Sequence, residues 1–197
     1  MAYGDPDRRL VRILLREEIA SAVKRLAGEV DRDYQDRPPL LVGILKGAFV
    51  FLADLVREMK IPPDGIEFLR LSSYGESTVS SGRARVALGL SRNSVAGRDV
   101  LVVDDIVDTG VTTAAALKYL ARHRPASLKV CALLDKPSRR RVPVHIDYLG
   151  FTVEDRFLVG YGLDLGQRYR HLPEIYAVEE SNGPETAHHG GQGRPGG

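Results

Sequence analysis

Residues 100–113 read Val100-Leu-Val-Val-Asp-Asp-Ile-Val-Asp-Thr-Gly-Val-Thr-Thr113, and this stretch is the most informative part of the chain. Its first four residues form a short, largely β-branched apolar run, which is typical of a buried parallel strand. Asp104 and Asp105 follow directly, and Asp108 comes three residues later. Open α/β sheets bind their ligands at the carboxyl ends of the strands, so these acids stand where a ligand site is expected.

The turn after these acids indicates a phosphate site. Thr109, Gly110, Thr112 and Thr113 lead into a predicted helix over residues 114–120. Backbone N–H groups and the helix dipole favour an anion at such an N-terminus. The acids before the turn suit sugar hydroxyls or a metal, so a phosphorylated sugar would use both halves of the stretch.

A simpler interpretation makes Asp108 only a helix N-cap and makes Asp104 and Asp105 turn residues. A receiver-type domain also places paired acids after a strand. A cap alone needs neither two further acids at the strand end nor a Thr-Gly-x-Thr-Thr turn behind it, so we favour the ligand site.

The rest of the chain alternates between two hydrophobic periodicities. Helical spacing predicts helices over residues 17–30 and 48–59. Short apolar or alternating runs predict strands at residues 11–15, 40–45, 66–71, 85–90, 128–134, 144–150 and 157–159. This alternation predicts an α/β fold around a mostly parallel sheet. We expect one domain over residues 1–180 and a disordered tail over residues 181–197, which is rich in Gly, Pro and His.

Composition narrows the class of protein. The net charge of +2 on 197 residues is too small to indicate a nucleic-acid partner. No apolar run approaches the ~18 residues of a membrane helix, and no signal peptide is visible, so we expect a cytoplasmic protein. The single Cys131 lies in an apolar run and is predicted to be a buried structural thiol. The basic run at residues 139–141 is predicted to be a solvated edge.

The signature stretch resembles the phosphoribosyl-pyrophosphate-binding motif of type I phosphoribosyltransferases, and aspartate at position 108 resembles the hypoxanthine-guanine branch. Further matches occur in family order over about residues 11–179: Leu45-Lys-Gly47, Leu71-Ser-Ser-Tyr-Gly75, Leu133-Leu-Asp-Lys-Pro137, Phe157-Leu-Val-Gly-Tyr-Gly-Leu-Asp164 and Arg168-Tyr-Arg-His-Leu172. The resemblance implies a mostly parallel twisted sheet flanked by helices, a small hood built from the chain termini, and a flexible lid loop.

The resemblance also implies a binding site for phosphoribosyl pyrophosphate. Its members would be Lys46, Gly47, Asp104, Asp105, Asp108, Thr109, Gly110, Val111, Thr112 and Arg170. The family commonly carries Glu at position 104, and Asp is one methylene shorter. Val111 stands where the family varies, so only its backbone is expected to matter. Taken alone, Lys46-Gly47 after a strand is more often a plain turn.

The purine side of the site is implied at four positions: Lys136, Phe157, Leu158 and Asp164. An ammonium is only a donor, which favours a 6-oxo group over a 6-amino group. Without the resemblance, Lys136 would be a surface charge and Phe157 a core aromatic. Asp164 is the implied Mg²⁺ carboxylate, with Asp104 and Asp105 as indirect metal contacts. Asp108 would be the catalytic acid/base at the purine N7.

Two functions follow from this resemblance. The first is an enzyme that transfers the 5-phosphoribosyl group to hypoxanthine or guanine in purine salvage, as a homodimer or homotetramer, with Ser73 and Tyr74 opening a lid loop. The second is a regulatory protein on the same scaffold that binds a nucleotide or RNA. The acid at position 108 favours the enzyme, because attenuation regulators of this fold tend to lack it.

Overall fold

The computed structural model describes residues 8–73 and 84–180. Its larger sheet has the strand order β4-β3-β2-β5-β6-β7. These strands are β4 (Ala84–Leu88), β3 (Gly65–Ser73), β2 (Leu40–Leu45), β5 (Asp99–Val107), β6 (Ser127–Asp135) and β7 (Tyr148–Thr152). All neighbouring pairs are parallel except β3 and β4, which pair antiparallel at the edge. The predicted α/β class with a mostly parallel sheet is therefore confirmed.

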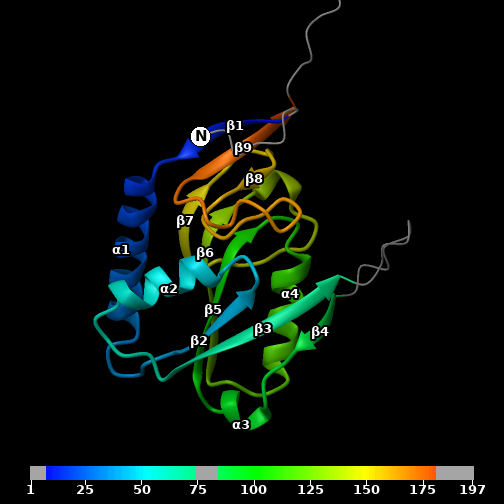
Figure 1. Ribbon diagram of the computed structural model, residues 1–197. Coiled ribbons are helices and arrows are strands. Elements are labelled where there is room, and N and C mark those ends of the chain that lie inside the picture. The colour runs from blue at the N-terminus through cyan, green and yellow to red at the C-terminus, as the bar shows by residue number, and fades with distance from the viewer. Residues whose placement is uncertain (1–7, 74–83, 181–197) are drawn as a thin grey trace, which may run out of the picture.

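A second sheet forms the hood above the first (Figure 1). It is antiparallel, with the order β1-β9-β8, and combines β1 (Arg8–Leu14) with β9 (Ile175–Glu180) and β8 (Leu158–Val159). The two ends of the described chain thus meet in one small sheet. The pattern analysis missed β9, because this short strand gains its partners only when β1 lies beside it.

Helices cover both faces of the large sheet (Figure 1). On one face α1 (Arg16–Asp33) packs on α2 (Phe49–Glu58) and on β7. Its buried residues recur at helical spacing: Ile19, Ala22, Val23, Leu26, Ala27 and Val30. On the other face α4 (Val111–Ala121) packs on β3, β4 and β5 and buries Ala116 and Leu120. A short α3 (Arg92–Val95) and a 3₁₀ turn (Pro137–Arg139) complete the described structure.

The largest differences between predicted and observed strand boundaries concern β5 and β7. β5 continues to Val107 instead of ending at residue 103, because β6 pairs with it as far as Val107 opposite Asp135. Asp104 and Asp105 therefore lie inside the strand. The predicted strand 144–150 begins only at Tyr148, where pairing with β6 starts. Just before it, the Asp147 carboxylate accepts the Val130 N–H (2.9 Å).

Two predictions about residue environment can also be checked. Cys131 is fully buried, as expected. The basic run is only in part a solvated edge, because the Arg140 side chain is 17% exposed and pairs with Asp135. Among the described residues, no helix has the length and apolar character that crossing a membrane requires.

Candidate active site

A cavity of about 350 Å³ opens at the carboxyl ends of β2 and β5. Seven of the predicted phosphoribosyl pyrophosphate residues line it: Gly47, Asp104, Asp105, Asp108, Thr109, Gly110 and Thr112. Ile44, Leu45, Ile106 and Thr113 line it as well, and these four were not predicted as site residues. Thr113 stood in the quoted signature, so its hydroxyl was the one visible signal among them.

The two adjacent acids of β5 occupy different environments. Asp104 is 4% exposed, and the Thr113 hydroxyl donates to its Oδ2 (2.8 Å). Asp105 is partly exposed. Burial raises the pKa of both carboxyl groups, and the neighbouring Asp105 adds to the effect on the pKa of Asp104. Because Asp104 is turned into the protein toward α4, Asp105 is the acid more accessible to a ligand.

Gly47 is required by the shape of this site. A Cβ on Gly47 would overlap the Asp105 carboxylate, so the backbone lies directly against that acid. One residue earlier, the peptide bond between Leu45 and Lys46 is cis. The Lys46 ammonium reaches across to the side chain of Gln167 (3.0 Å).

The turn between β5 and α4 has the conformation that the sequence suggested. Gly110 has φ +79° and precedes the first residue of α4, Val111. A Cβ on Gly110 would overlap the carbonyl oxygen of Val142, so glycine is needed for space as well as for backbone angle. The Val111 N–H points at the Thr109 hydroxyl (3.4 Å). The N-terminus of α4 therefore opens onto the cavity beside the Thr109 and Thr112 side chains.

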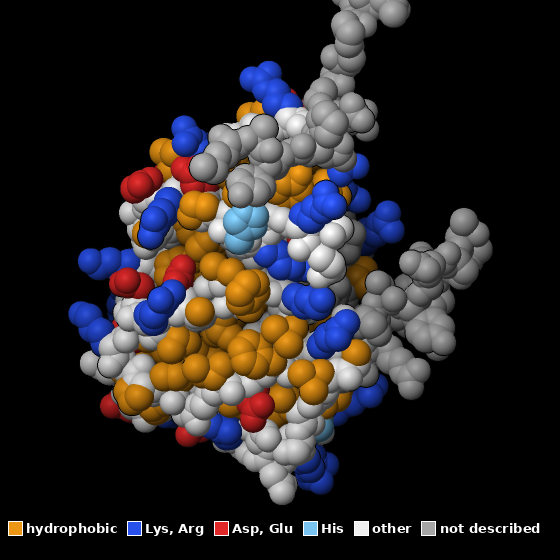
Figure 2. All heavy atoms as spheres, in the orientation of Figure 1, with side chains coloured by type: hydrophobic (Ala, Val, Ile, Leu, Met, Phe, Trp, Pro, Cys, Tyr) orange, Lys and Arg blue, Asp and Glu red, His pale blue; other side chains and the backbone are white. Residues whose placement is uncertain are grey.

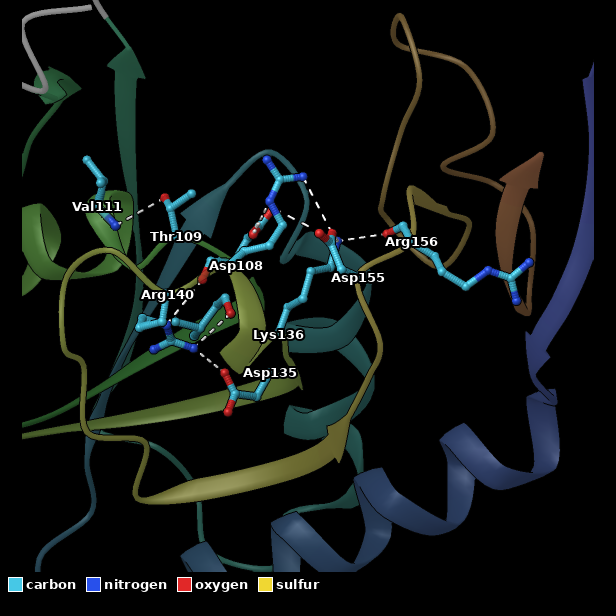
Figure 3. Close-up of polar contacts among 10 residues, drawn as sticks. Asp108, Thr109, Val111, Asp135, Lys136, Arg140, Asp155 and Arg156 are labelled. Carbon is cyan, nitrogen blue, oxygen red and sulfur yellow. Dashed lines mark hydrogen bonds and ion pairs between the residues drawn. The ribbon is translucent and has the colours of Figure 1, made fainter. Parts of the chain in front are cut away.

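Asp108 belongs to a cluster of charges that Figure 3 shows beside this turn. The Lys136 ammonium lies 3.9 Å from Asp108 and 3.9 Å from Asp155. The Arg139 guanidinium lies 3.5 Å from Asp108 and 3.6 Å from Asp155. Oδ1 of Asp108 is buried and has no hydrogen-bond partner among the described residues. The sequence analysis did not predict Asp155 or Arg139 as site residues, because the family resemblance assigned a function to neither position.

Lys136 is not a surface charge. Its side chain is 4% exposed and makes a hydrogen bond to the Arg156 carbonyl (2.8 Å). Phe157 is not a core aromatic either, because it is 53% exposed. Leu158 is buried in β8 opposite Ala177. The Phe157 carbonyl accepts from Val178 (2.8 Å), so by the alternation of antiparallel strands the Leu158 carbonyl points away from β9.

Asp164 and Arg170 form an ion pair in the loop between β8 and β9. The Arg170 guanidinium lies 2.6 Å from Asp164 and also donates to the Gly162 carbonyl (2.6 Å). The Gln167 N–H donates to the other oxygen of Asp164 (2.8 Å). A Cβ on Gly162 would overlap the carbonyl oxygen of Gly47, so this loop touches the Lys46-Gly47 backbone. The predicted Asp164, Arg170 and Lys46 are thus brought together next to the cavity.

The proposed lid residues fall at the edge of what is described. The backbone of Ser73 ends β3 and pairs with Ala84. Tyr74 lies outside the described residues.

Comparison with known proteins gives one consistent result. The phosphoribosyl transferase domain model matches residues 12–165. The hypoxanthine-guanine phosphoribosyltransferase of Aquifex aeolicus is 45% identical over 174 residues, which are 88% of this chain and 97% of the relative. That of Bacillus subtilis is 44% identical over 163 residues, 83% of this chain and 89% of the relative.

Solved structures agree with the sequence matches. A hypoxanthine-guanine phosphoribosyltransferase from Bacillus anthracis superposes with a TM-score of 0.79 at 36% identity, covering 87% of this chain and 99% of that one. The hypoxanthine phosphoribosyl transferase of Trypanosoma cruzi gives a TM-score of 0.78 at 39% identity, and the match covers 85% of this chain and 90% of that one. The chain therefore belongs to the phosphoribosyltransferase family, in the branch of the hypoxanthine-guanine enzymes.

Proposed function

We propose that this chain transfers the 5-phosphoribosyl group from phosphoribosyl pyrophosphate to hypoxanthine or guanine, releasing pyrophosphate and giving a 6-oxopurine nucleotide. The observation that carries the proposal is the pairing of Lys136 with Asp108 at 3.9 Å beside the turn at the N-terminus of α4. O6 and N7 are neighbours on one edge of a 6-oxopurine. A buried donor and an adjacent carboxylate therefore match that edge.

Lys136 supports selection of the base. Its one hydrogen bond goes to the Arg156 carbonyl, which leaves other ammonium N–H groups for a ligand. Hypoxanthine and guanine offer O6 as an acceptor, whereas adenine offers a second donor. A site built around a hydrogen bond rejects the analogue that cannot make it. The exposed Phe157 would offer a ring face for stacking. The Leu158 carbonyl, which points away from β9, would accept from the purine N1–H or 2-amino group.

Asp108 is proposed as the general base. The purine N9 forms the bond to C1 of the ribose as the bond from C1 to the pyrophosphate oxygen breaks, and pyrophosphate leaves with that electron pair. The proton on N7 passes to the carboxylate of Asp108. The buried Oδ1, which lacks a hydrogen-bond partner in the described part of the chain, supports this role.

The rest of the cavity suits the phosphorylated sugar. The turn at Thr109 to Thr112 offers backbone N–H groups and hydroxyls for the 5′-phosphate. Asp105, the more accessible acid, is positioned for a ribose hydroxyl, and Asp104 supports the turn through Thr113. Gly47, which has no side chain, would let the backbone approach the pyrophosphate. Lys46 and Arg170 would add positive charge near that leaving group.

Mg²⁺ is the expected metal, and the residues fit its usual binding mode. In proteins this ion commonly takes one or two carboxylates and completes its shell with substrate phosphate oxygens and water. No group of three or more His, Cys, Asp or Glu side chains suited to a metal occurs in the described ranges. Asp164 keeps lone pairs beyond its two protein partners, so it would hold the ion together with pyrophosphate. The bound ion would neutralise charge on the leaving group.

Chelation tests the metal assignment. Excess EDTA should abolish transfer, and Mg²⁺ should restore it. Asp164→Asn should raise the Mg²⁺ concentration that gives half-maximal rate. Full activity in excess chelator would contradict the assignment.

One assay tests the function itself: pyrophosphate release with hypoxanthine, guanine, xanthine, adenine and uracil as separate substrates. Hypoxanthine and guanine should react, whereas adenine and uracil should not. If no base reacts while a purine nucleotide still binds tightly, the regulatory function would replace the enzyme. No observation on the relatives or on this site favours that alternative.

We also propose a homodimer or homotetramer. Figure 2 shows hydrophobic side chains gathered on the face that carries α2 and β3. Phe49, Ile66 and Phe68 are exposed there, and a second copy would remove them from water. Light scattering should give at least a dimer, and Phe68→Glu should shift it toward monomer. A monomeric wild type at micromolar concentration would disprove this arrangement.

A further inference from the structure

The backbone carbonyls of the turn after β5 are held by one neighbouring segment. The Val107 carbonyl accepts from the Lys136 N–H (3.0 Å) and from Arg140 Nη2 (3.0 Å). The Asp108 carbonyl accepts from Arg140 Nε (3.1 Å). The Thr109 carbonyl accepts from the N–H groups of residues 141 and 142 (2.9 and 3.0 Å). Residues 136–142 do not line the cavity, so all three carbonyl groups are directed away from it.

This direction matters for an anion site. A turn binds phosphate when its N–H groups face the ligand, because a carbonyl dipole facing the same ligand would repel it. A peptide unit that rotates exchanges its N–H for its carbonyl. A group that holds the carbonyls of the turn away from the cavity therefore keeps the N–H groups of the turn directed toward it.

Arg140 is the side chain that does this. Figure 3 shows its guanidinium between Asp135 and the backbone of Asp108. It donates to two carbonyl groups and pairs with the Asp135 carboxylate, which uses the forked donor geometry of a guanidinium. Its stem packs on the same turn, since a Cβ on Gly110 would lie 2.9 Å from Arg140 Cδ. The side chain is 17% exposed, so these bonds are largely shielded from water.

We propose that Arg140 is a positioning residue for the phosphate-binding turn, an inference that rests on the proposed function. Without its guanidinium the Asp108 carbonyl loses its donor. The peptide unit between Asp108 and Thr109 then has no hydrogen bond to its own carbonyl, although the Val107 and Thr109 carbonyls on either side of it keep theirs. Rotation of this unit would turn a carbonyl toward the 5′-phosphate.

The purine pocket should respond differently. Lys136 is anchored by its own N–H bond to the Val107 carbonyl and by its ammonium bond to the Arg156 carbonyl. Neither bond requires Arg140. Loss of Arg140 should therefore weaken phosphoribosyl pyrophosphate much more than hypoxanthine, whereas a general loss of packing would weaken both substrates alike.

The experiment compares Arg140→Met with Arg141→Met. Methionine keeps the apolar stem of Arg140 and removes the fork. Arg141 is exposed, and its side chain makes no ion pair or hydrogen bond with the described residues, which makes it a matched control. For Arg140→Met the KM for phosphoribosyl pyrophosphate should rise about tenfold to a hundredfold, the range expected for a buried polar group left unpaired. The KM for hypoxanthine should change by less than about threefold, and Arg141→Met should change neither constant beyond that.

Two further variants keep the test decisive. Arg140→Lys offers one compact donor group in place of the fork and should give an intermediate KM for phosphoribosyl pyrophosphate. Arg140→Ala should recover affinity for that substrate when guanidinium ion is added at low millimolar concentration, whereas Asp108→Asn should not. Equal changes in both KM values would overturn the proposal. A KM for phosphoribosyl pyrophosphate in Arg140→Lys equal to that of the wild type would also overturn it. This second criterion applies even if Arg140→Met fails to fold.

The failure of this inference is distinguishable from failure of the proposed function. A wild-type chain that releases no pyrophosphate with any base would disprove the function. An active wild type whose Arg140 variants show no difference between the two substrates would disprove only the role of Arg140.

Discussion

Two lysines at opposite ends of β6 belong to charge clusters of different kinds, one closed by its own hydrogen bonds and one that we propose binds a ligand. Lys129, near the start of the strand, lies 3.3 Å from Asp33 and donates to the Tyr148 hydroxyl (3.1 Å), which donates to Asp33 (2.7 Å). Lys136, just past its end, lies 3.9 Å from both Asp108 and Asp155. The first cluster is closed by its own hydrogen bonds. The second is spaced more widely than hydrogen bonds allow.

The difference indicates which end is prepared for a ligand. At the first end, one buried group remains without a hydrogen-bond partner among the described residues, the Tyr34 hydroxyl. Burial raises its pKa to about 12, so it stays neutral. At the second end the group without such a partner is a carboxylate oxygen, Oδ1 of Asp108. The nearest described cation to this oxygen is the Arg139 guanidinium, at 3.5 Å and without a hydrogen bond, which leaves the oxygen able to accept the substrate proton that we propose it takes.

The largest expected effect comes from Asp108→Asn. It preserves shape but removes the base, so kcat with hypoxanthine should fall roughly 10²–10⁴-fold, the usual scale for general acid–base catalysis. Asp33→Asn, at the closed cluster, is the matched control and should leave kcat unchanged. Steady-state kinetics measures kcat, and circular dichroism shows whether each variant is folded, so a loss of catalysis can be told from a loss of folding. Near-normal turnover of Asp108→Asn would mean that the open cluster does not carry the chemistry.

Lys136→Ala should affect the base and spare the sugar phosphate. We expect the KM for hypoxanthine and guanine to rise about tenfold to a hundredfold, because the O6 acceptor loses its buried donor. The KM for phosphoribosyl pyrophosphate should change much less. Lys129→Ala provides the comparison at the other end of β6 and should alter neither constant. An equal rise for both substrates would argue against a specific contact with the purine.

A smaller effect, on stability alone, is expected from Tyr148→Phe. It removes the hydrogen bond to Asp33, so the free energy of unfolding at pH 7 should fall by ~1 kcal/mol, or about 2–4 °C in melting temperature. That hydrogen bond is the main reason why the pKa of Asp33 lies below its ordinary value of 3.8. A lowered folded pKa gives stability that is present above pH 3.8 and is lost as pH falls through the folded value.

The difference between wild type and Tyr148→Phe should therefore be complete at pH 7 and shrink below pH 3.8. Urea denaturation at both ends of that range measures it, while kcat at pH 7 should stay the same. A difference that persists unchanged in acid would show that packing, and not the bond to Asp33, is responsible.

The smallest effect is expected from deletion of residues 181–197. This segment is poor in side chains that could bury apolar surface, so ordering it would not be offset. Melting temperature and kcat should both remain at their full-length values. A clear drop in either would show that the segment contributes to the folded protein.

Sequence patterns anticipated most elements of this fold and much of the cavity lining. They did not predict features that depend on contacts with residues distant in the sequence. The acids at positions 104 and 105 favour a turn by composition, yet pairing with β6 keeps them in β5. Three consecutive arginines at positions 139–141 are equivalent in the sequence. The structure buries most of the middle one and leaves the Arg139 side chain 45% exposed, because only Arg140 finds Asp135 and two carbonyls beside it.

The hydrogen bond from the Lys136 N–H to the Val107 carbonyl has a consequence for inhibitor design. It ties the strand end that presents Lys136 to the strand end that leads into the turn at the N-terminus of α4. A compound that joins a purine-like head to a phosphate-like group would meet a receptor whose two halves keep a fixed separation. Linker length should then have a sharp optimum, with affinity falling on either side, because neither half can adjust to a linker that is too short or too long.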